Sequence, residues 1–251
     1  MQINMWALYA REVKRFQKIW LDTVFTPIIS VALFLGVFGI VTSGRQVDGL
    51  PYLTFVYTGL LAMLVINNSF SNASFALVIA KNLGNMIDLQ LAPIAPWRIG
   101  IAYALAALSR GVITLVIALL GTVWFIPGLG LPEHPLYFIL ALFFTGLEFG
   151  MLGVAFGFLA KNFEALTFMN TFVMQPMIFL AGVFYPVATL PSPWNTISLF
   201  NPIHHNVNFF RYAITGYSDF NPNFSLLVIL GFSVILFVIM QWATKRNIKM
   251  K

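Results

Sequence analysis

Six long apolar stretches constrain this chain more than any other feature of its sequence. They cover residues 21–41, 52–80, 99–125, 136–159, 165–184 and 224–243. A helix needs about 20 mostly apolar residues to cross a bilayer, and no stretch carries more than one charged residue. Gly, Pro and charged residues gather between them, as in loops that join antiparallel membrane helices. The sequence predicts an all-α integral membrane protein with six transmembrane helices in one domain over residues 1–251.

The composition excludes most soluble functions. Hydrophobic residues make up 59% of the 251 residues and charged residues only 9%, whereas a soluble domain carries about 25% charged residues. Too few charges remain to cover a surface that faces water, which argues against a soluble enzyme or a free binding module. The absence of cysteine excludes disulfides, thiolate metal sites and cysteine catalysis.

The basic residues indicate the orientation in the membrane. Eleven of the 14 Lys and Arg residues fall on one side, in the N-terminal segment, the second and fourth loops and the C-terminal tail. Six spans place both termini on the same side, and the positive-inside rule makes that side cytoplasmic. The net charge of +6 is therefore a topology signal, and we expect no nucleic-acid partner.

Residues 1–20 are predicted to form an amphipathic interface helix. An apolar stripe recurs at spacings of three and four: Trp6, Tyr9, Val13, Phe16 and Trp20. The basic residues lie largely off this stripe, and a helix with a Trp-rich face and a basic face lies among lipid headgroups. Two interpretations stay open, a surface anchor that fixes topology and a lever that also touches a cytoplasmic partner.

The second loop, residues 81–98, contains a second short amphipathic element. Leu83, Ile87 and Leu91 are four residues apart, so residues 82–92 can form a helix with one apolar face, which two prolines then end. Polar side chains lie away from that face: Asn85, Asp88 and Gln90. Such a helix can receive a push from a soluble protein, but spacing alone favours an ordinary loop helix resting on the membrane.

Two spans carry amide side chains. The second span contains Asn68 and Asn72, one turn apart, and the fifth contains Asn170 and Gln175. Amides that face lipid leave donors and acceptors unsatisfied, so we expect these side chains to face protein or water. Hydrogen bonds between helices and a polar pathway explain them equally well.

Arg110 and Glu148 are the only charges deep inside predicted spans. Charges within a membrane are costly and are usually paired. Each lies eleven or twelve residues from the start of its helix, and the two helices follow one another in the chain. Their depths therefore match, and we hypothesise an ion pair that braces the third and fourth spans. A proton relay is the alternative.

The long segment between the fifth and sixth spans is predicted to form a re-entrant hairpin. It is helical from about residue 204 to 214, after the start signal Asn201-Pro202, and its aromatic residues favour the outer leaflet. His204 and His205 are adjacent, so on a helix they point about 100° apart. A structural or lipid-contacting role is therefore favoured over a metal site.

The chain lacks the motifs of nucleotide binding and hydrolysis. The dipeptide Gly-Lys does not occur, which rules out a P-loop, and no G-x-S-x-G or H-E-x-x-H is present. We predict no catalytic residue, no metal and no cofactor in this chain.

Three sequence blocks resemble a known family. They are IDLQLAPIAPWRI at residues 87–99, LAGVFYPVATLPSPW at 180–194 and NPIHHNVNFFRY at 201–212. With the basic amphipathic N-terminus and six spans, they resemble the type-2 ATP-binding-cassette export permeases, in particular the short bacterial inner-membrane members. The resemblance covers nearly the full length. The family loop often carries glutamates before its leucines, whereas Asp88 is the only acid here.

The resemblance implies a half-transporter, a transport subunit and not an enzyme. Two copies would form a homodimeric pore, and separate ATP-binding-cassette ATPase subunits would bind ATP and Mg. It implies a bacterial inner-membrane location with lipid contacts. It also assigns the second loop as the coupling helix that contacts the ATPase, through Asn85, Ile87, Asp88, Gln90 and Leu91. It places four amides along or beside the pathway at the dimer axis: Asn68, Asn72, Asn170 and Gln175.

Two other functions remain alternatives. An ion-coupled secondary transporter or channel would use Glu148 and Arg110, and an integral-membrane enzyme would use His204 or His205 at the outer surface. For a transporter, amide-lined spans suit lipids, glycolipids, glycans or amphipathic drugs.

Overall fold

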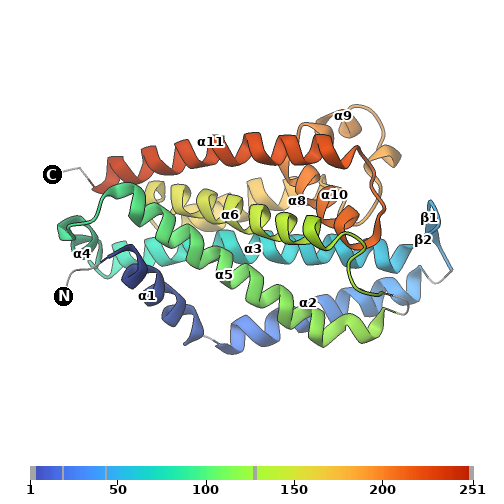
Figure 1. Cartoon of the computed structure of the whole chain (residues 1–251), viewed down its shortest axis with the longest axis horizontal. Helices are drawn as coiled ribbons and strands as arrows, with labels where there is room; N and C mark the ends of the chain where they lie inside the picture. The colour runs from blue at the N-terminus through green and yellow to red at the C-terminus, as the bar shows by residue number, and fades with distance from the viewer. Residues whose placement is uncertain (1–3, 19, 43, 127–128, 249–251) are drawn as a thin grey trace.

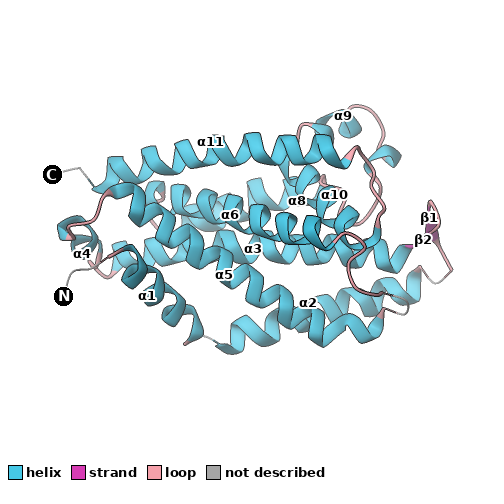
Figure 2. Ribbon diagram, in the orientation of Figure 1, coloured by secondary structure: helices cyan, strands magenta, loops and turns pink. Residues whose placement is uncertain are grey.

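The computed structural model describes residues 4–18, 20–42, 44–126 and 129–248 and is built almost wholly of helices (Figures 1 and 2). Among these residues, four helices are long and apolar enough to cross a bilayer: α3 (Tyr52–Asn82), α5 (Pro96–Thr122), α6 (Pro135–Leu159) and α11 (Pro222–Ile248). The shortest has 25 residues, or about 37 Å at 1.5 Å per residue, against about 30 Å of hydrocarbon. The second, third, fourth and sixth predicted spans are thus confirmed as candidate membrane helices.

Glycines on α6 allow close packing at the centre of the bundle. They recur every three or four residues: Gly146, Gly150, Gly153 and Gly157. A Cβ atom at Gly153 would collide with the main-chain oxygen of Phe70 in α3, and one at Gly150 would lie 2.9 Å from the main-chain oxygen of Ala104 in α5. Small residues let membrane helices approach to backbone contact, so α6 packs directly against both neighbours.

The N-terminal helix α1 (Met5–Gln17) packs against α5. It begins at Asn4, whose side-chain oxygen accepts a hydrogen bond from the main-chain nitrogen of Ala7 at 2.8 Å. Its buried face consists of Leu8, Glu12 and Phe16, each one turn from the next. This face differs from the predicted stripe, which shares only Phe16 with it; Trp6 is 62% exposed, and the side chain of Trp20 lies outside the described residues.

The first and fifth predicted spans form shorter apolar helices. Helix α2 (Trp20–Val41) contains Pro27 and has an apolar portion from Phe25 to Val41. Residues 163–179 form a helical run of α7 (Phe163–Phe168), the π-helix η2 (Met169–Met174) and α8 (Gln175–Phe179).

Pro176 explains why the fifth segment departs from a regular α-helix. Proline has no N–H to donate to the carbonyl four residues earlier. In the π-helix before Pro176, main-chain N–H groups bond to the carbonyl five residues earlier instead of four. The N–H of Gln175, for example, donates to the oxygen of Asn170. The helical run then ends at Phe179, short of the predicted end at Phe184.

The two ends of the bundle differ (Figure 1). One end, the terminal end, holds the short helix α4 (Met86–Leu91), the start of α1 and the end of α11. The other, the hairpin end, holds the strands β1 (Gln46–Val47) and β2 (Leu50–Pro51) with the helices α9 (Trp194–Leu199) and α10 (Pro202–Thr215). Two short helices remain, η1 (Val123–Phe125) and η3 (Val187–Thr189), among the residues that the structure describes. The predicted helix at residues 204–214 corresponds to α10.

Candidate functional site

Helix α3 is buried along most of its length, but one stripe of it is accessible. Between residues 54 and 78, the residues that are not buried are Met63, Asn67, Asn68, Ser71 and Phe75. Their spacing of three and four places them on one face of the helix. The accessible face of this central helix is therefore polar in its middle third.

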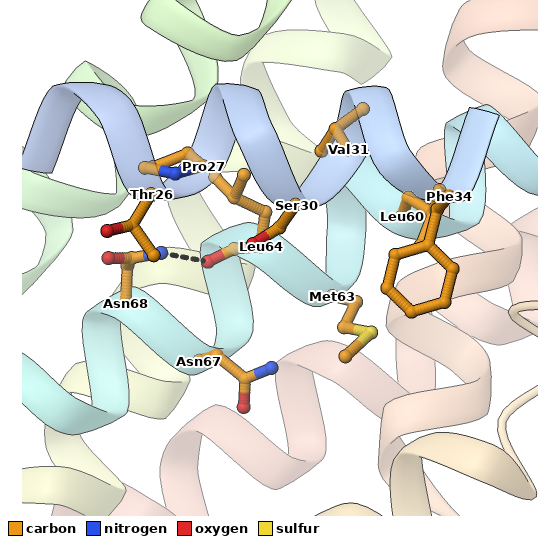
Figure 3. A pocket seen from close by; sticks show the side chains of 10 residues that line it. All are labelled: Thr26, Pro27, Ser30, Val31, Phe34, Leu60, Met63, Leu64, Asn67 and Asn68. Atoms are coloured by element: carbon orange, nitrogen blue, oxygen red, sulfur yellow. Dashed lines mark hydrogen bonds between the residues drawn. The ribbon is translucent and has the colours of Figure 1, made fainter. Parts of the chain in front are cut away.

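Two cavities open along this face. The first, of about 260 Å³, lies between α2 and α3, where Asn68 donates a hydrogen bond to the main-chain oxygen of Leu64 at 3.0 Å (Figure 3). Its lining consists of Thr26, Pro27, Ser30, Val31, Phe34, Leu60, Met63, Leu64, Asn67 and Asn68. The second cavity, of about 430 Å³, shares Asn67 and Asn68 with the first. We call the two together the α3 groove.

The second cavity extends the groove toward the terminal end and is more polar. Its lining consists of Arg15, Asn67, Asn68, Ser71, Asn72, Phe75, Ile79 and Arg110. Amides, a hydroxyl and two guanidinium groups can hydrogen-bond a polar group, whereas the first cavity is walled mainly by apolar side chains. The α3 groove is thus amphipathic along its length.

Helix α1 closes one side of the groove through Arg15. One terminal nitrogen of Arg15, Nη2, donates to both the main-chain oxygen and the side-chain oxygen of Asn72, each at 3.0 Å. Glu12 holds Arg15 in place at 2.7 Å and also pairs with Arg11 at 3.1 Å. Glu12 is only 3% exposed. A buried carboxylate therefore fixes α1 against the polar face of α3, a contact that the hydropathy of residues 1–20 did not predict.

The four amides predicted to line a pathway fall into two pairs. Asn68 and Asn72 line the α3 groove. Asn170, on η2, and Gln175, at the start of α8, lie outside the two cavities of the groove. The pathway role of all four residues stays a prediction.

The predicted coupling residues gather on α4. Leu89 is buried and Gln90 donates to the main-chain oxygen of Asn247 at 3.1 Å, so the helix is held against the end of α11. Ile87 and Leu91 point outward, 55% and 78% exposed. Asn85 and Asp88 are exposed as well.

The predicted start of this helix at residue 82 was wrong. Helix α3 continues to Asn82, and the chain then turns at Gly84, whose φ is +75°. Only glycine adopts that conformation without strain. The turn leaves a helix of six residues, Met86–Leu91.

The hypothesised ion pair between Arg110 and Glu148 is absent from the part of the chain that the structure describes. The carboxylate oxygens of Glu148 accept hydrogen bonds from Asn206 in α10 and Ser233 in α11, both at 2.8 Å. Arg110 instead lines the α3 groove. The two residues lie on helix faces that point in different directions, which counting residues from the helix ends did not reveal.

Helix α10 carries buried polar side chains whose partners the sequence did not predict. Arg211 is fully buried and donates to Asp219 at 3.2 Å, to the main-chain oxygen of Gly182 at 2.7 Å and to Thr58 at 3.3 Å. Its guanidinium also lies 3.6 Å from the centre of the Phe55 ring. Burial lowers the pKa of Arg211 to about 10, although Asp219 opposes the shift. The sequence feature that could have indicated these contacts is the density of polar residues in the NPIHHNVNFFRY block.

The two adjacent histidines of α10 have structural partners. His204 Nδ1 lies 3.1 Å from the main-chain oxygen of Ala181, and His205 lies within hydrogen-bond distance of Ser225 and of the main-chain oxygen of Leu199. Burial lowers the pKa of His204 to about 4. Over the described ranges, no group of three or more His, Cys, Asp or Glu side chains is placed to hold a metal ion.

Comparisons with known proteins agree on one family. The sequence profile of the ABC-2 type transporter family matches residues 3–215. The inner membrane transport permease YadH of Escherichia coli (strain K12) is 30% identical over 240 residues, which cover 94% of this chain and 92% of YadH. Nodulation protein J of Rhizobium leguminosarum bv. viciae is 27% identical over 262 residues, covering 98% of this chain and 95% of that protein.

Proposed function

The chain belongs to the ABC-2 type transporter family, and on that premise we propose that two copies form the membrane pore of an exporter driven by separate ATPase subunits. As a member of this family it is a transmembrane transport subunit of an ATP-binding-cassette transporter. The proposal adds the homodimer, the attachment site of the ATPase, the export direction and the orientation. In it, both termini lie in the cytoplasm and the protein resides in the bacterial inner membrane among lipids.

The exposed apolar surface of α4, together with Leu83 just before the turn at Gly84, is the observation that carries this proposal. Leu83, Ile87 and Leu91 are 68%, 55% and 78% exposed, although α4 itself is held by Leu89 and Gln90. Exposed apolar patches mark sites where another molecule binds. The patch lies at the terminal end, which the positive-inside rule assigns to the cytoplasm, and an ATPase in the cytoplasm can reach it there.

The α3 groove supports a pore between two copies. Its polar residues face an open side of the protomer, and amides that face lipid are unfavourable. A second copy that covers this side would enclose the groove between the two protomers. In this arrangement α2 and residues 163–179 complete six crossings, and the segment after α8 forms the outer re-entrant hairpin.

The motor acts through α4 in this proposal. ATP and Mg bind to the partner ATPase, whose closure moves α4. A ligand shifts a conformational equilibrium only if it binds one state more tightly than the other. The bonds that join α4 to α11 and α1 to α3 would pass the displacement to the groove.

Replacing Leu91 tests the attachment of the ATPase. We expect Leu91→Asp to reduce about tenfold the amount of ATPase that co-purifies from cells expressing both subunits, since a loss of about 1.4 kcal/mol corresponds to tenfold. Leu131→Asp is the matched control, because Leu131 is 92% exposed and lies between α5 and α6 at the hairpin end. Equal co-purification by the two variants would contradict the proposal.

A labelling experiment separates this proposal from a helix resting on the membrane. The chain has no cysteine, so Leu91→Cys introduces a single thiol. We expect a bulky, membrane-impermeant maleimide to label it in inside-out vesicles, and we expect bound ATPase to block the labelling. Slow labelling both with and without the ATPase would place Leu91 in the headgroup layer and reject the attachment site.

A further inference from the structure

The hairpin end contains a cavity that the proposed transport function does not use. It has a volume of about 680 Å³ and lies between the β1–β2 hairpin, η3 and the loop that follows α10. This volume lies within the range of about 300–1,000 Å³ that is typical of small-molecule sites. The residues that matter to its chemistry are Arg45, Gln46, Asp48, Tyr52, Tyr217 and Asp219.

One hydroxyl in this cavity faces two carboxylates. The hydroxyl of Tyr217 lies 2.8 Å from Asp219 and 3.1 Å from Asp48. A phenol has a single O–H and can donate to only one acceptor at a time. Whichever carboxylate accepts this proton, an oxygen of the other carboxylate can still accept a hydrogen bond from a ligand. Burial and the two neighbouring carboxylates raise the pKa of Tyr217, so that its proton is retained.

The two carboxylates are positioned from opposite sides. Asp219 is anchored by its ion pair with the buried Arg211 at 3.2 Å and by a hydrogen bond from its main-chain nitrogen to Asn208 at 2.9 Å. Asp48 comes from the turn between β1 and β2, where both Asp48 and Gly49 have positive φ. The carboxylate of Asp219 is thus fixed, and that of Asp48 is carried on a tight two-residue turn.

The charges that line the cavity favour a neutral ligand. Arg211 pairs with Asp219, and the lining adds one positive charge, on Arg45, and one negative charge, on Asp48. With equal numbers of positive and negative charges, the site offers no net charge to attract a phosphate or a carboxylate. A divalent metal prefers several oxygen ligands, and the described residues contain no group of three or more His, Cys, Asp or Glu side chains that could hold a metal ion.

The remaining lining matches a saccharide. Tyr52 and Tyr217 bring aromatic rings to the cavity, and Thr189 and Ser218 bring hydroxyls. A saccharide ring presents C–H groups on its face and hydroxyls on its edge, and those hydroxyls both donate and accept. Aspartate accepts, arginine donates, and glutamine does both.

We propose that the hairpin-end cavity binds a neutral saccharide. Ring hydroxyls donate to Asp48 and Asp219 and accept from Arg45 and Gln46, and the ring face packs against the tyrosines. This site goes beyond the transport function, because it requires neither a second copy nor an ATPase. Under the proposed orientation it would meet sugars on the outer side of the membrane.

Saturation-transfer NMR tests the site on the full chain alone. The protein is placed in nanodiscs of phosphatidylethanolamine and phosphatidylglycerol, without a glycoside detergent, because a sugar headgroup would compete. Maltose, cellobiose, galactose and N-acetylglucosamine are titrated at millimolar concentrations. We expect saturable binding of at least one sugar. No saturable binding by any of the four would overturn the proposal.

Two variants locate the binding. We expect Tyr217→Phe, which keeps the ring and removes the hydroxyl, and Asp48→Asn, which tolerates the positive φ, each to weaken binding about tenfold, equivalent to about 1.4 kcal/mol. Asn195→Ala, on the exposed helix α9 and outside the cavity, is the control.

The controls separate this proposal from its alternatives. Unchanged affinity in Asp48→Asn, whose side chain is exposed in a turn, would place the sugar elsewhere and overturn the proposal even if Tyr217→Phe failed to fold. A thermal shift caused by calcium and not by sugars, and lost in Asp48→Asn, would assign a cation site instead. The experiment contains no ATPase, so a failure of the proposed transport function leaves its outcome unaffected.

Discussion

At the scale of single residues, Arg211 shows how one buried guanidinium joins distant parts of the chain. Its three nitrogens contact Asp219, Gly182 and Thr58, and its plane lies over Phe55. Lysine offers one compact charge and no planar fork, so it cannot reproduce these contacts. Breaking a buried ion pair by removing one partner leaves the other charge uncompensated.

We expect Arg211→Met to destabilise the protein strongly. Removing one member of a buried pair costs roughly 3–5 kcal/mol, because Asp219 keeps its charge without a cationic partner. Thermal unfolding in nanodiscs measures the effect, with the exposed Arg45→Met as the control. The double variant Arg211→Met with Asp219→Asn should recover part of the loss. A double variant as unstable as the single one would show that the ion pair is not the cause.

Glu148 gives a second test at this scale. Its oxygens accept from Asn206 and Ser233, so Glu148→Gln keeps an acceptor for Asn206 and can donate to Ser233. We expect Glu148→Gln to retain most of the folded protein, measured as the monodisperse fraction in size-exclusion chromatography. Glu148→Leu should lose more, since each unsatisfied buried polar group costs about 1–3 kcal/mol.

The exchange of Arg110 and Glu148 checks that these residues are independent. If they formed an ion pair, the double variant Arg110→Glu with Glu148→Arg would fold better than either single variant. In the structure they contact different elements, so we expect the two losses to add. Rescue by the exchange would restore the ion-pair hypothesis.

At the scale of elements, the glycines of α6 determine how closely α3 can approach. Gly153→Ala adds a Cβ atom that collides with the main-chain oxygen of Phe70, so we expect a large drop in the unfolding temperature. Gly231 is the matched control, because it lies in α11 with open space around it. Gly231→Ala should be neutral or stabilising by up to about 1 kcal/mol, the difference in helix propensity. Similar behaviour of the two variants would reject this packing argument.

Most long elements could be predicted from the sequence, because apolar length is a property of each segment alone. The four membrane-length helices appear where continuous apolar runs exceed the bilayer thickness. The turn at Gly84 and the π-helix before Pro176 were missed. Both depend on the conformation of one or two residues, which a hydropathy average over many residues does not detect.

The candidate site was predicted less completely, because its geometry depends on which helix faces meet. Asn68 and Asn72 were identified as polar groups in a span, but the contact of Asn72 with Arg15 depends on how α1 packs. Glu12 is buried although glutamate is a hydrophilic residue, so hydropathy did not predict its burial. Depth along a helix follows from residue counting, whereas rotation about the helix axis follows from tertiary packing.

At the scale of the whole molecule, α10 and α4 are held by their neighbours to different degrees. Residues of α10 and its N-cap bond to four other helices: Asn201, the N-cap, to α8, Asn206 to α6, Asn208 to α11 and Arg211 to α3. At the terminal end, among the residues that the structure describes, α4 is held by one side-chain hydrogen bond and by buried Leu89. Regions with few buried contacts open with the smallest free energy.

We expect hydrogen exchange to reflect this difference. Amide protons of α10 should exchange far more slowly than those of α4, because local opening of α10 breaks polar contacts to four helices at once. Exchange mass spectrometry of the protein in nanodiscs measures both segments in one sample. Comparable rates in α10 and α4 would contradict the expectation.

The network around α10 has a mechanical consequence. Helices that are all bonded to one buried helix cannot move independently of one another at that level of the bundle. The polar side chains of α10 and its N-cap tie four helices together near the hairpin end. A displacement of α4 would then move an element with few bonds of its own, while the four helices bonded to α10 keep their arrangement near the hairpin end.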